Sequence, residues 1–164
     1  MICSLEDIKI RTRLKPGDTS YVIWMHGHHY SREYGYGTGF ENYVAAGLCE
    51  FHETFEPALD GVWIAEHKDK TAGFILLMHR GDEAQLRFFI VDPVFRGIGL
   101  GNLLMNKFME HARSRSFKKA FLWTTTDLKV ASGLYIKHGF TLVEEKRSSF
   151  FGKEVCEQKY ERLI

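Results

Sequence analysis

The chain has 164 residues, of which 45% are hydrophobic, 14% aromatic and 26% charged. This length corresponds to about one domain, and the apolar content excludes a disordered or low-complexity protein, because enough surface can be buried to offset the entropy lost on ordering. Twenty-two Lys and Arg residues against 21 Asp and Glu leave a formal charge of +1, so no global field attracts nucleic acid or an anionic membrane. Any anion must therefore be bound by local groups.

The first half of the chain predicts a strand and two helices. Ile8 and Ile10 alternate with charged residues and indicate an antiparallel or edge strand. Apolar residues at helical spacing predict a first helix over residues 18–33. Thr38 and Glu41 stand three residues apart, which is the spacing of a capping box, and they predict the start of a second helix that ends before the next proline.

The second half changes from helical to strand periodicity. Strands of an antiparallel meander are expected at 61–66, 72–78 and 85–91. An amphipathic helix is expected at 100–116, a strand at 120–124, and a helix started by Thr126 or Asp127 at 128–138. Two final strands are expected at 140–143 and 154–162. No internal repeat or linker interrupts this order. We therefore expect a mixed α/β (α+β) fold, with a mostly antiparallel sheet flanked by helices, in a single domain spanning residues 1–164.

The cysteines and the N-terminal residues bear on the cellular compartment. Cys3, Cys49 and Cys156 are far apart and none belongs to a C-x-x-C pair, so they indicate neither a zinc site nor a redox motif. Residues 1–13 lack an apolar signal core, and no run approaches the roughly eighteen apolar residues of a membrane span. The sequence thus predicts a cytoplasmic protein with no membrane partner.

The glycine-rich turn after the meander is the most informative segment. It reads Val91-Asp92-Pro93-Val94-Phe95-Arg96-Gly97-Ile98-Gly99-Leu100-Gly101-Asn102. A strand stops at the proline, and alternating glycines open a helix whose first N–H groups point the same way at the positive end of the helix dipole. Side chains at the glycine positions would hold a ligand away from the backbone. This arrangement suits a pyrophosphate, although the segment alone is also compatible with an ordinary strand-to-helix turn.

Two common phosphate-binding patterns do not fit this turn. A Walker A loop needs Gly-Lys-Ser or Gly-Lys-Thr at its end, and this loop ends in Gly101-Asn102. A dinucleotide fingerprint that begins at Gly97 or Gly99 would place its last glycine on Asn102 or Leu104. The preceding chain is moreover an antiparallel meander, whereas that fingerprint belongs to a parallel βαβ unit.

The remaining pattern, Arg-x-x-Gly-x-Gly over residues 96–101, resembles the acyl-CoA-binding motif of the GNAT superfamily of N-acetyltransferases. The segment 127–140, which contains Leu-Tyr and ends His-Gly-Phe, resembles the second motif of that superfamily, a tyrosine-bearing helix that ends at Gly-Phe. Two motifs in the right order and at the right separation are more specific than one glycine loop. The resemblance covers nearly all of the chain, is strongest over residues 85–143, and implies a GNAT-like acyl-CoA N-acyltransferase fold.

A more specific resemblance concerns residues 26–35, which read His-Gly-x-x-Tyr-x-x-Glu-Tyr-Gly, and the strand Leu122-Trp123-Thr124. Both are similar to the acetyltransferase half of proteins that fuse this domain to a MarR-type DNA-binding domain. Because no winged-helix segment precedes them here, DNA binding is not carried over, and no nucleic-acid partner is expected.

The resemblance implies how the co-substrate acetyl-CoA would be bound. The backbone of Phe89-Ile90-Val91 would hold the pantetheine arm, and a main-chain N–H of Ile90 or Val91 would polarise the thioester carbonyl and stabilise the oxyanion. The side chains of this strand are equally compatible with core packing. The diphosphate would lie on the loop, with Arg96, Gly97, Ile98, Gly99, Leu100, Gly101 and Asn102 as the binding residues.

The implied reaction is direct attack of a primary amine on acetyl-CoA in a ternary complex. An amine of pKa near 10 is only about 0.1% neutral at pH 7, so a base is useful. The usual glutamate of the superfamily falls at Gln85, which cannot accept a proton at neutral pH. Glu83, Glu33 and a histidine acting through water remain candidates, and we favour Glu33 because the 26–35 segment would border the acceptor cleft.

Tyr135 would protonate the departing CoA thiolate, because a phenol of pKa near 10 can donate to a thiolate once water is excluded. Because Tyr135 lies on an apolar helix face, it is also compatible with a purely structural role in the core. Leu128 stands where many relatives carry an asparagine that contacts the pantetheine, so this contact is either missing or made by Asp127.

No metal is expected. Histidines at 28 and 29 point about 100° apart on a helix, and no carboxylate or cysteine joins them and His26 at a fixed ligand spacing. The sequence therefore predicts a cytoplasmic acetyl-CoA-dependent N-acetyltransferase that acts on a small-molecule or peptide amine and is compatible with a homodimer. A non-catalytic CoA-binding sensor or interaction module is the alternative, and Gln85 favours it.

Overall fold

The computed structural model describes residues 4–164, and the chain divides into two compact units. Unit 1 contains the N-terminal segment up to Lys15, the stretch Glu56–Ala120 and Ile164, whereas unit 2 contains Pro16–Phe55 and Phe121–Leu163. Cys3 lies outside the described residues, and the two described cysteines, Cys49 and Cys156, are both free thiols.

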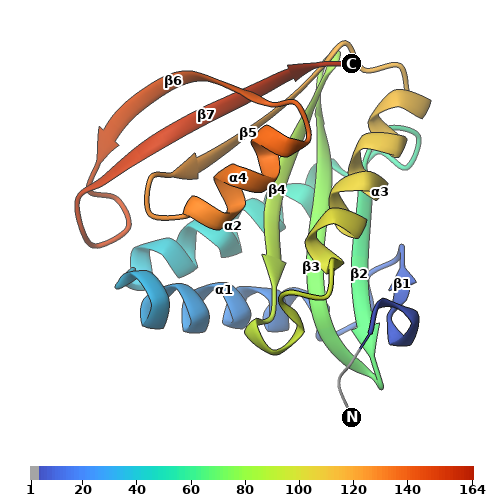
Figure 1. Cartoon of the computed structure of the whole chain (residues 1–164), viewed down its shortest axis with the longest axis horizontal. Helices are drawn as coiled ribbons and strands as arrows, with labels where there is room; N and C mark the ends of the chain where they lie inside the picture. Colours follow the sequence, from blue (N-terminus) through green and yellow to red (C-terminus); the bar gives the residue numbers. More distant parts are fainter. Residues whose placement is uncertain (1–3) are drawn as a thin grey trace. The chain divides into compact units, whose positions relative to one another are not determined.

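Unit 1 is an antiparallel meander covered by a long helix (Figure 1). Its elements are the 3-10 helix η1 (Leu5–Asp7), β1 (Lys9–Arg11), β2 (Gly61–His67), β3 (Lys70–Arg80), β4 (Glu83–Val91), the 3-10 helix η2 (Pro93–Phe95) and α3 (Leu100–Ser114). The strands are ordered β1-β2-β3-β4, with each neighbouring pair antiparallel. The predicted edge strand, meander and amphipathic helix are therefore confirmed.

The core of unit 1 lies between β3 and α3. Ala72–Met78 of β3 are buried without interruption, as expected for a strand inside a sheet that is covered by other elements. Along α3, Leu100, Leu104, Phe108 and Ala112 recur at intervals of four residues and are buried, which gives the helix its apolar stripe. Leu103, which borders this stripe, is only partly buried.

Unit 2 combines three helices of the described chain with the remaining strands. Its elements are α1 (Asp18–Tyr34), α2 (Thr38–Thr54), β5 (Lys119–Thr125, from residue 121 on), α4 (Lys129–Lys137), β6 (Thr141–Ser148) and β7 (Val155–Leu163). Strand β7 lies between β5 and β6 and pairs with β6 in antiparallel register. Since both units join helices to antiparallel strands, the mixed α/β class with a mostly antiparallel sheet flanked by helices is confirmed.

The expected capping box at the start of α2 is wrong. Gly37 is the N-cap residue and has an extended backbone, so Thr38 is already the first helical residue and no side-chain cap hydrogen bond forms. The Gly37 N–H donates to the carbonyl oxygen of Phe151 at 2.8 Å, which holds the chain extended up to the residue before Thr38. A contact across more than a hundred residues thus sets the helix boundary.

The predicted start of α4 is also wrong. The helix begins at Lys129 with Leu128 as its N-cap residue, after both Thr126 and Asp127. The carboxylate of Asp127 lies 3.0 Å from the ammonium of Lys153 and makes no cap to the helix. A distant ion pair has therefore replaced the local capping interaction that the sequence suggested.

The end of α4 follows the prediction and fixes the position of Tyr135. Gly139 has a φ of +81°, and its N–H donates to the carbonyl of Ile136 at 2.9 Å, while the N–H of Phe140 donates to the carbonyl of Tyr135 at 3.0 Å. These two bonds form a Schellman motif, with the buried Phe140 ring 6.3 Å from the Tyr135 ring as its hydrophobic contact.

Candidate functional site

The glycine-rich loop of unit 1 joins β4 to α3 through η2. Gly97 and Gly99 have φ values of +83° and +90°, a left-handed conformation that residues with a side chain rarely adopt. No heavy atom lies within 4 Å of the position that a Cβ on Gly97 would take, so its backbone faces open space. The loop is held at its start by Asp92, whose N–H donates to the carbonyl of Ala72 and whose carboxylate accepts from the N–H of Val94, both at 2.9 Å.

The loop delivers the chain into the N-terminus of α3, a helix of 15 residues with Gly99 as its N-cap. The first intrahelical bond runs from the N–H of Leu103 to the carbonyl of Gly99 at 3.1 Å. The amides of Leu100 and Gly101 therefore precede the hydrogen-bond ladder, and the first turn contains no acidic residue. This end of a helix attracts an anion with several acceptor oxygens.

Arg96 joins the loop to the end of the preceding strand. Its Nε donates to the carbonyl of Val91 at 3.3 Å, and the residue as a whole is exposed. Ile98 and Asn102 are partly buried beside it. The strand end at Val91 and the binding residues predicted at 96–102 are therefore brought together in unit 1.

Strand β4 contains a bulge that the sequence did not reveal. Phe88 and Phe89 together lie opposite the single residue Ile75 of β3. Phe88 has a φ of +53°, and the guanidinium of Arg87 lies 4.6 Å above its ring. A bulge interrupts the ladder and re-aims the backbone groups that follow it, which here begin with Ile90. No sequence signal predicts this bulge, since the left-handed conformation favours glycine or asparagine.

The side chains around the bulge pack as core residues. Phe88 and Ile90 are buried, whereas Phe89 and Val91 are partly exposed, in the alternation expected of a strand. Core packing and main-chain binding therefore remain compatible along this strand.

Gln85, which replaces the usual catalytic glutamate, and Glu83, a candidate for the general base, both lie at the start of β4. The side-chain oxygen of Gln85 accepts from Arg80 Nε at 2.8 Å, and the Glu83 carboxylate lies 2.9 Å from Lys119 Nζ. Glu83 and Val91 are the two ends of this strand, which corresponds to about 25 Å of extended chain. Glu83 is thus engaged by a lysine at the end of the strand remote from the loop.

The two predicted catalytic residues belong to unit 2. Tyr135 is 5% exposed, with the rings of Phe140 and Tyr160 at 6.3 and 6.2 Å. Its burial raises the pKa of Tyr135 well above the ordinary value of a phenol, so the hydroxyl keeps its proton at neutral pH. Glu33 is exposed on the last turn of α1. Tyr135 is therefore a buried phenol, while Glu33 is an exposed residue.

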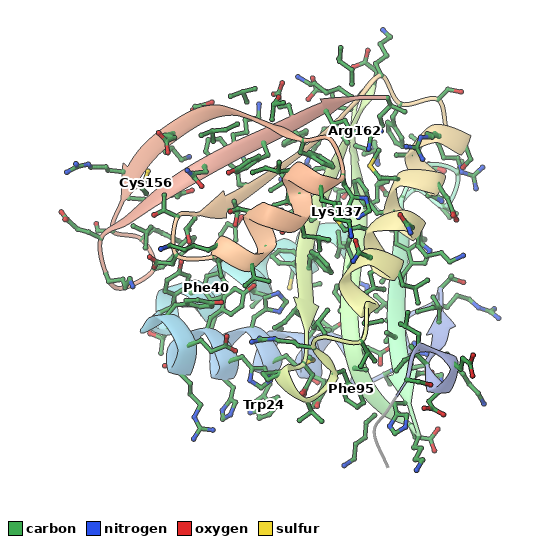
Figure 2. The ribbon with its side chains drawn as sticks, viewed as in Figure 1. Trp24, Phe40, Phe95, Lys137, Cys156 and Arg162 are labelled. Atoms are coloured by element: carbon green, nitrogen blue, oxygen red, sulfur yellow. The ribbon has the colours of Figure 1, made fainter. Side chains whose placement is uncertain are left out.

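An aromatic cluster of unit 2 surrounds the connection from α1 to α2. Phe40, labelled on α2 in Figure 2, has the rings of Tyr30, Tyr36, Tyr43 and Phe151 within 6.3 Å of its own. The hydroxyl of Tyr36 bonds Thr125 Oγ1 at 2.6 Å, and burial raises the pKa of Tyr36 to about 12. The aromatic content of this segment was visible in the sequence, but the partners from residues 125 and 151 were not.

The histidines of α1 do not form a ligand set. His26 is buried and its Nδ1 bonds the carbonyl of Val22 at 2.8 Å, whereas the Nε2 of His28 accepts from Arg32 at 3.2 Å. Over residues 4–164, no group of three or more His, Cys, Asp or Glu side chains is placed to hold a metal ion. Within the same residues, no helix combines the length and the apolar character needed to cross a membrane.

Comparison with known proteins identifies the family. The model of the acetyltransferase (GNAT) family matches residues 23–140. An uncharacterized N-acetyltransferase of Escherichia coli is 31% identical over 120 residues, covering 70% of this chain and 71% of that protein. The chain therefore belongs to the GNAT family, whose members are acetyl-CoA-dependent N-acetyltransferases, and the matched segment includes the glycine loop, the bulged strand and Tyr135.

Other relatives match over different shares of their length. An uncharacterized N-acetyltransferase of Methanocaldococcus jannaschii is 33% identical over 94 residues, which is 53% of this chain but only 40% of that protein. The structure of spermidine N-acetyltransferase from Vibrio cholerae, in complex with CoA and spermine, superposes with a TM-score of 0.71 at 16% identity and covers 96% of each chain. This likeness shows that the fold is shared.

Burial of His26 predicts a specific loss of stability in acid. Burial lowers the pKa of His26 to about 4 from an ordinary 6.5, so the unfolded chain binds a proton that the folded one excludes. The free energy of unfolding is therefore unaffected by this histidine above pH 6.5, and it decreases as the pH falls from 6.5 toward 4, because only the unfolded chain then binds the proton. Urea unfolding should show a loss of about 2 kcal/mol between about pH 7.5 and about pH 5 that is absent in His26→Phe.

The control for this experiment is His52→Phe, which changes an exposed histidine of α2 in the same unit. It should retain the loss seen in the unchanged chain. An equal loss in His26→Phe would show that other groups cause the acid sensitivity.

Proposed function

We propose that this chain transfers the acetyl group of acetyl-CoA to a primary amine by direct attack in a ternary complex. The observation that carries the proposal is the left-handed glycine turn before the N-terminus of α3, in a chain of the GNAT family. The segment that matches the family model, residues 23–140, includes residues of both units, and this supports one acetyltransferase domain spanning residues 1–164.

The residues of unit 1 fit the co-substrate. An accessible left-handed turn and the first amides of α3 supply donors for a diphosphate, so residues 96–102 would hold that group. The main chain of Phe89–Val91, which begins within the bulge, would bind the pantetheine arm. A main-chain N–H of Ile90 or Val91 would donate to the thioester oxygen and stabilise the charge that develops there.

Acetyl-CoA, when bound, supplies the acetyl thioester. Glu33, directly or through water, would take a proton from the acceptor ammonium, since the Gln85 amide cannot do so. The amine nitrogen then bonds to the acetyl carbon as the carbon–sulfur bond breaks. Tyr135, a buried phenol that holds its proton at neutral pH, would give that proton to the leaving thiolate, and the second proton lost by the nitrogen would restore the phenol through water.

The acceptor class is a small-molecule or peptide amine. The spermidine enzyme of Vibrio cholerae has the same fold and supports an amine as the acceptor. A net charge of +1 supports neither a nucleic-acid nor a membrane partner. Two free thiols among the described residues fit a reducing, cytoplasmic setting.

The function is tested by incubating the protein with acetyl-CoA and a panel of amines, aminoacyl compounds and peptides, and following thiol release. We expect release that depends on at least one amine. Binding of CoA without turnover on any acceptor would favour a CoA-binding sensor or interaction module, for which the amide at Gln85 is the supporting observation. Absence of CoA binding would contradict both functions.

A carboxylate placed in the loop should repel CoA. In Gly97→Asp, the added charge stands where the diphosphate would lie, and CoA should bind about tenfold more weakly or worse by calorimetry. The matched control is Gly81→Asp in the β3–β4 turn, because Gly81 also has a positive φ of +65° and open space around it. Equal affinity in the two variants would place the diphosphate elsewhere.

Removal of the Tyr135 hydroxyl should separate binding from turnover. Tyr135→Phe keeps the buried ring but cannot protonate the thiolate, so kcat should fall about a hundredfold while CoA affinity is kept. Tyr160→Phe is the control, since Tyr160 is equally buried and lies 6.2 Å away in the same unit. If Tyr135→Phe turned over at the rate of Tyr160→Phe, the tyrosine would be a packing residue.

A further inference from the structure

The ammonium of Lys153 lies among three groups of unit 2 that come from two other parts of the chain, residues 34–36 and residue 127. Lys153 belongs to the connection between β6 and β7, and its Nζ donates to the carbonyl oxygen of Tyr34 at 2.7 Å. The same Nζ lies 3.0 Å from Asp127 Oδ2 and 5.5 Å from the centroid of the Tyr36 ring. We name the Tyr34 carbonyl, the Tyr36 ring and the Asp127 carboxylate the ammonium cradle.

The aromatic face of the cradle is fixed independently of the lysine. The Tyr36 ring is 3% exposed and is fixed by the bond from its hydroxyl to Thr125 Oγ1. Asp127 Oδ2 is buried, and its contact with Lys153 is an ion pair without the geometry of a directed hydrogen bond. A carbonyl, a carboxylate and an aromatic face are the groups that recognise a primary ammonium, so the cradle could accept one from another molecule.

The side chain of Lys153 can leave the cradle while its loop stays in place. The loop is anchored by Phe151, whose carbonyl accepts from the Gly37 N–H at 2.8 Å and whose ring stacks on Tyr36 at 5.5 Å. The lysine side chain itself is 38% exposed. A partly exposed ion pair adds little to stability, so stabilisation alone does not account for a cradle with a buried carboxylate oxygen.

We propose that the ammonium cradle is the subsite for the ammonium of the amine acceptor, and that Lys153 fills it in the free protein as an internal competitor. This inference rests on the proposed function only in taking the acceptor to be a primary amine. Binding exchanges one ammonium for another of the same charge, and no covalent bond changes. Since the free cradle is only a fraction of the population, the apparent affinity for an amine is reduced by that fraction. Glu33, the favoured base, directly precedes Tyr34 in the chain.

The test empties the cradle and offers a probe of matching shape. Lys153→Ala removes the atoms from Cγ to Nζ, which correspond to n-propylammonium, and binding of n-propylammonium is measured by NMR titration without acetyl-CoA. We expect Lys153→Ala to bind this probe about tenfold more tightly than the unchanged chain. Adding Asp127→Asn to Lys153→Ala should abolish the gain, because the carboxylate is the charged part of the cradle.

The matched control is Lys146→Ala. Lys146 also lies over an aromatic ring, that of Trp123 at 4.3 Å, and 3.8 Å from the Glu157 carboxylate, but it stands on the exposed strand β6. Its removal should produce no gain in binding. If Lys153→Ala fails to fold by circular dichroism, Lys153→Ser also removes the stem that fills the cradle and should still bind the probe more tightly than the unchanged chain.

The proposal is overturned if the folded Lys153 variant binds n-propylammonium no better than the unchanged chain, if the gain survives Asp127→Asn, or if Lys146→Ala shows the same gain. Because the probe is titrated without acetyl-CoA, each of these results is independent of acetyl transfer. Thiol release decides separately whether the chain is an acetyltransferase.

Discussion

The left-handed turn at Gly97 and Gly99 is the constraint on which the proposed binding of CoA by unit 1 depends. With a net charge of only +1, the protein has no long-range field for a phosphorylated ligand, so the attraction has to come from oriented main-chain dipoles. The turn ends the strand and aims the first amides of α3 outward in one step. Any residue with a Cβ would strain the backbone there and narrow the approach to it.

Much of the fold could be predicted because its elements are encoded locally. The meander and α3 follow from hydrophobic periodicity, and the end of α4 follows from the glycine at 139. The N-caps of α2 and α4 could not be predicted. Each depends on a residue of the β6–β7 connection, Phe151 or Lys153, that is distant in the sequence. Local capping rules fail where a tertiary contact uses the same group.

The same distinction holds for the candidate site. The left-handed glycine turn into α3 could be predicted because glycine positions and a strand-to-helix change are visible in one short segment. The bulge at Phe88 was not, because a phenylalanine gives no sign of a positive φ, and the setting of Lys153 requires three elements to be folded first. A site made of main-chain groups and long-range pairs is thus only partly visible in one sequence.

The bulge at Phe88 has an implication for the evolution of this chain. A side-chain-bearing residue held at a positive φ costs roughly 1–2 kcal/mol, a sizeable part of the margin of a small protein. Glycine would relieve that strain but would lose the ring that packs beneath Arg87. Because Phe88 is buried, removing its ring would cost about 3–5 kcal/mol, more than the strain that glycine relieves, so selection for thermal tolerance alone would leave the bulge in place.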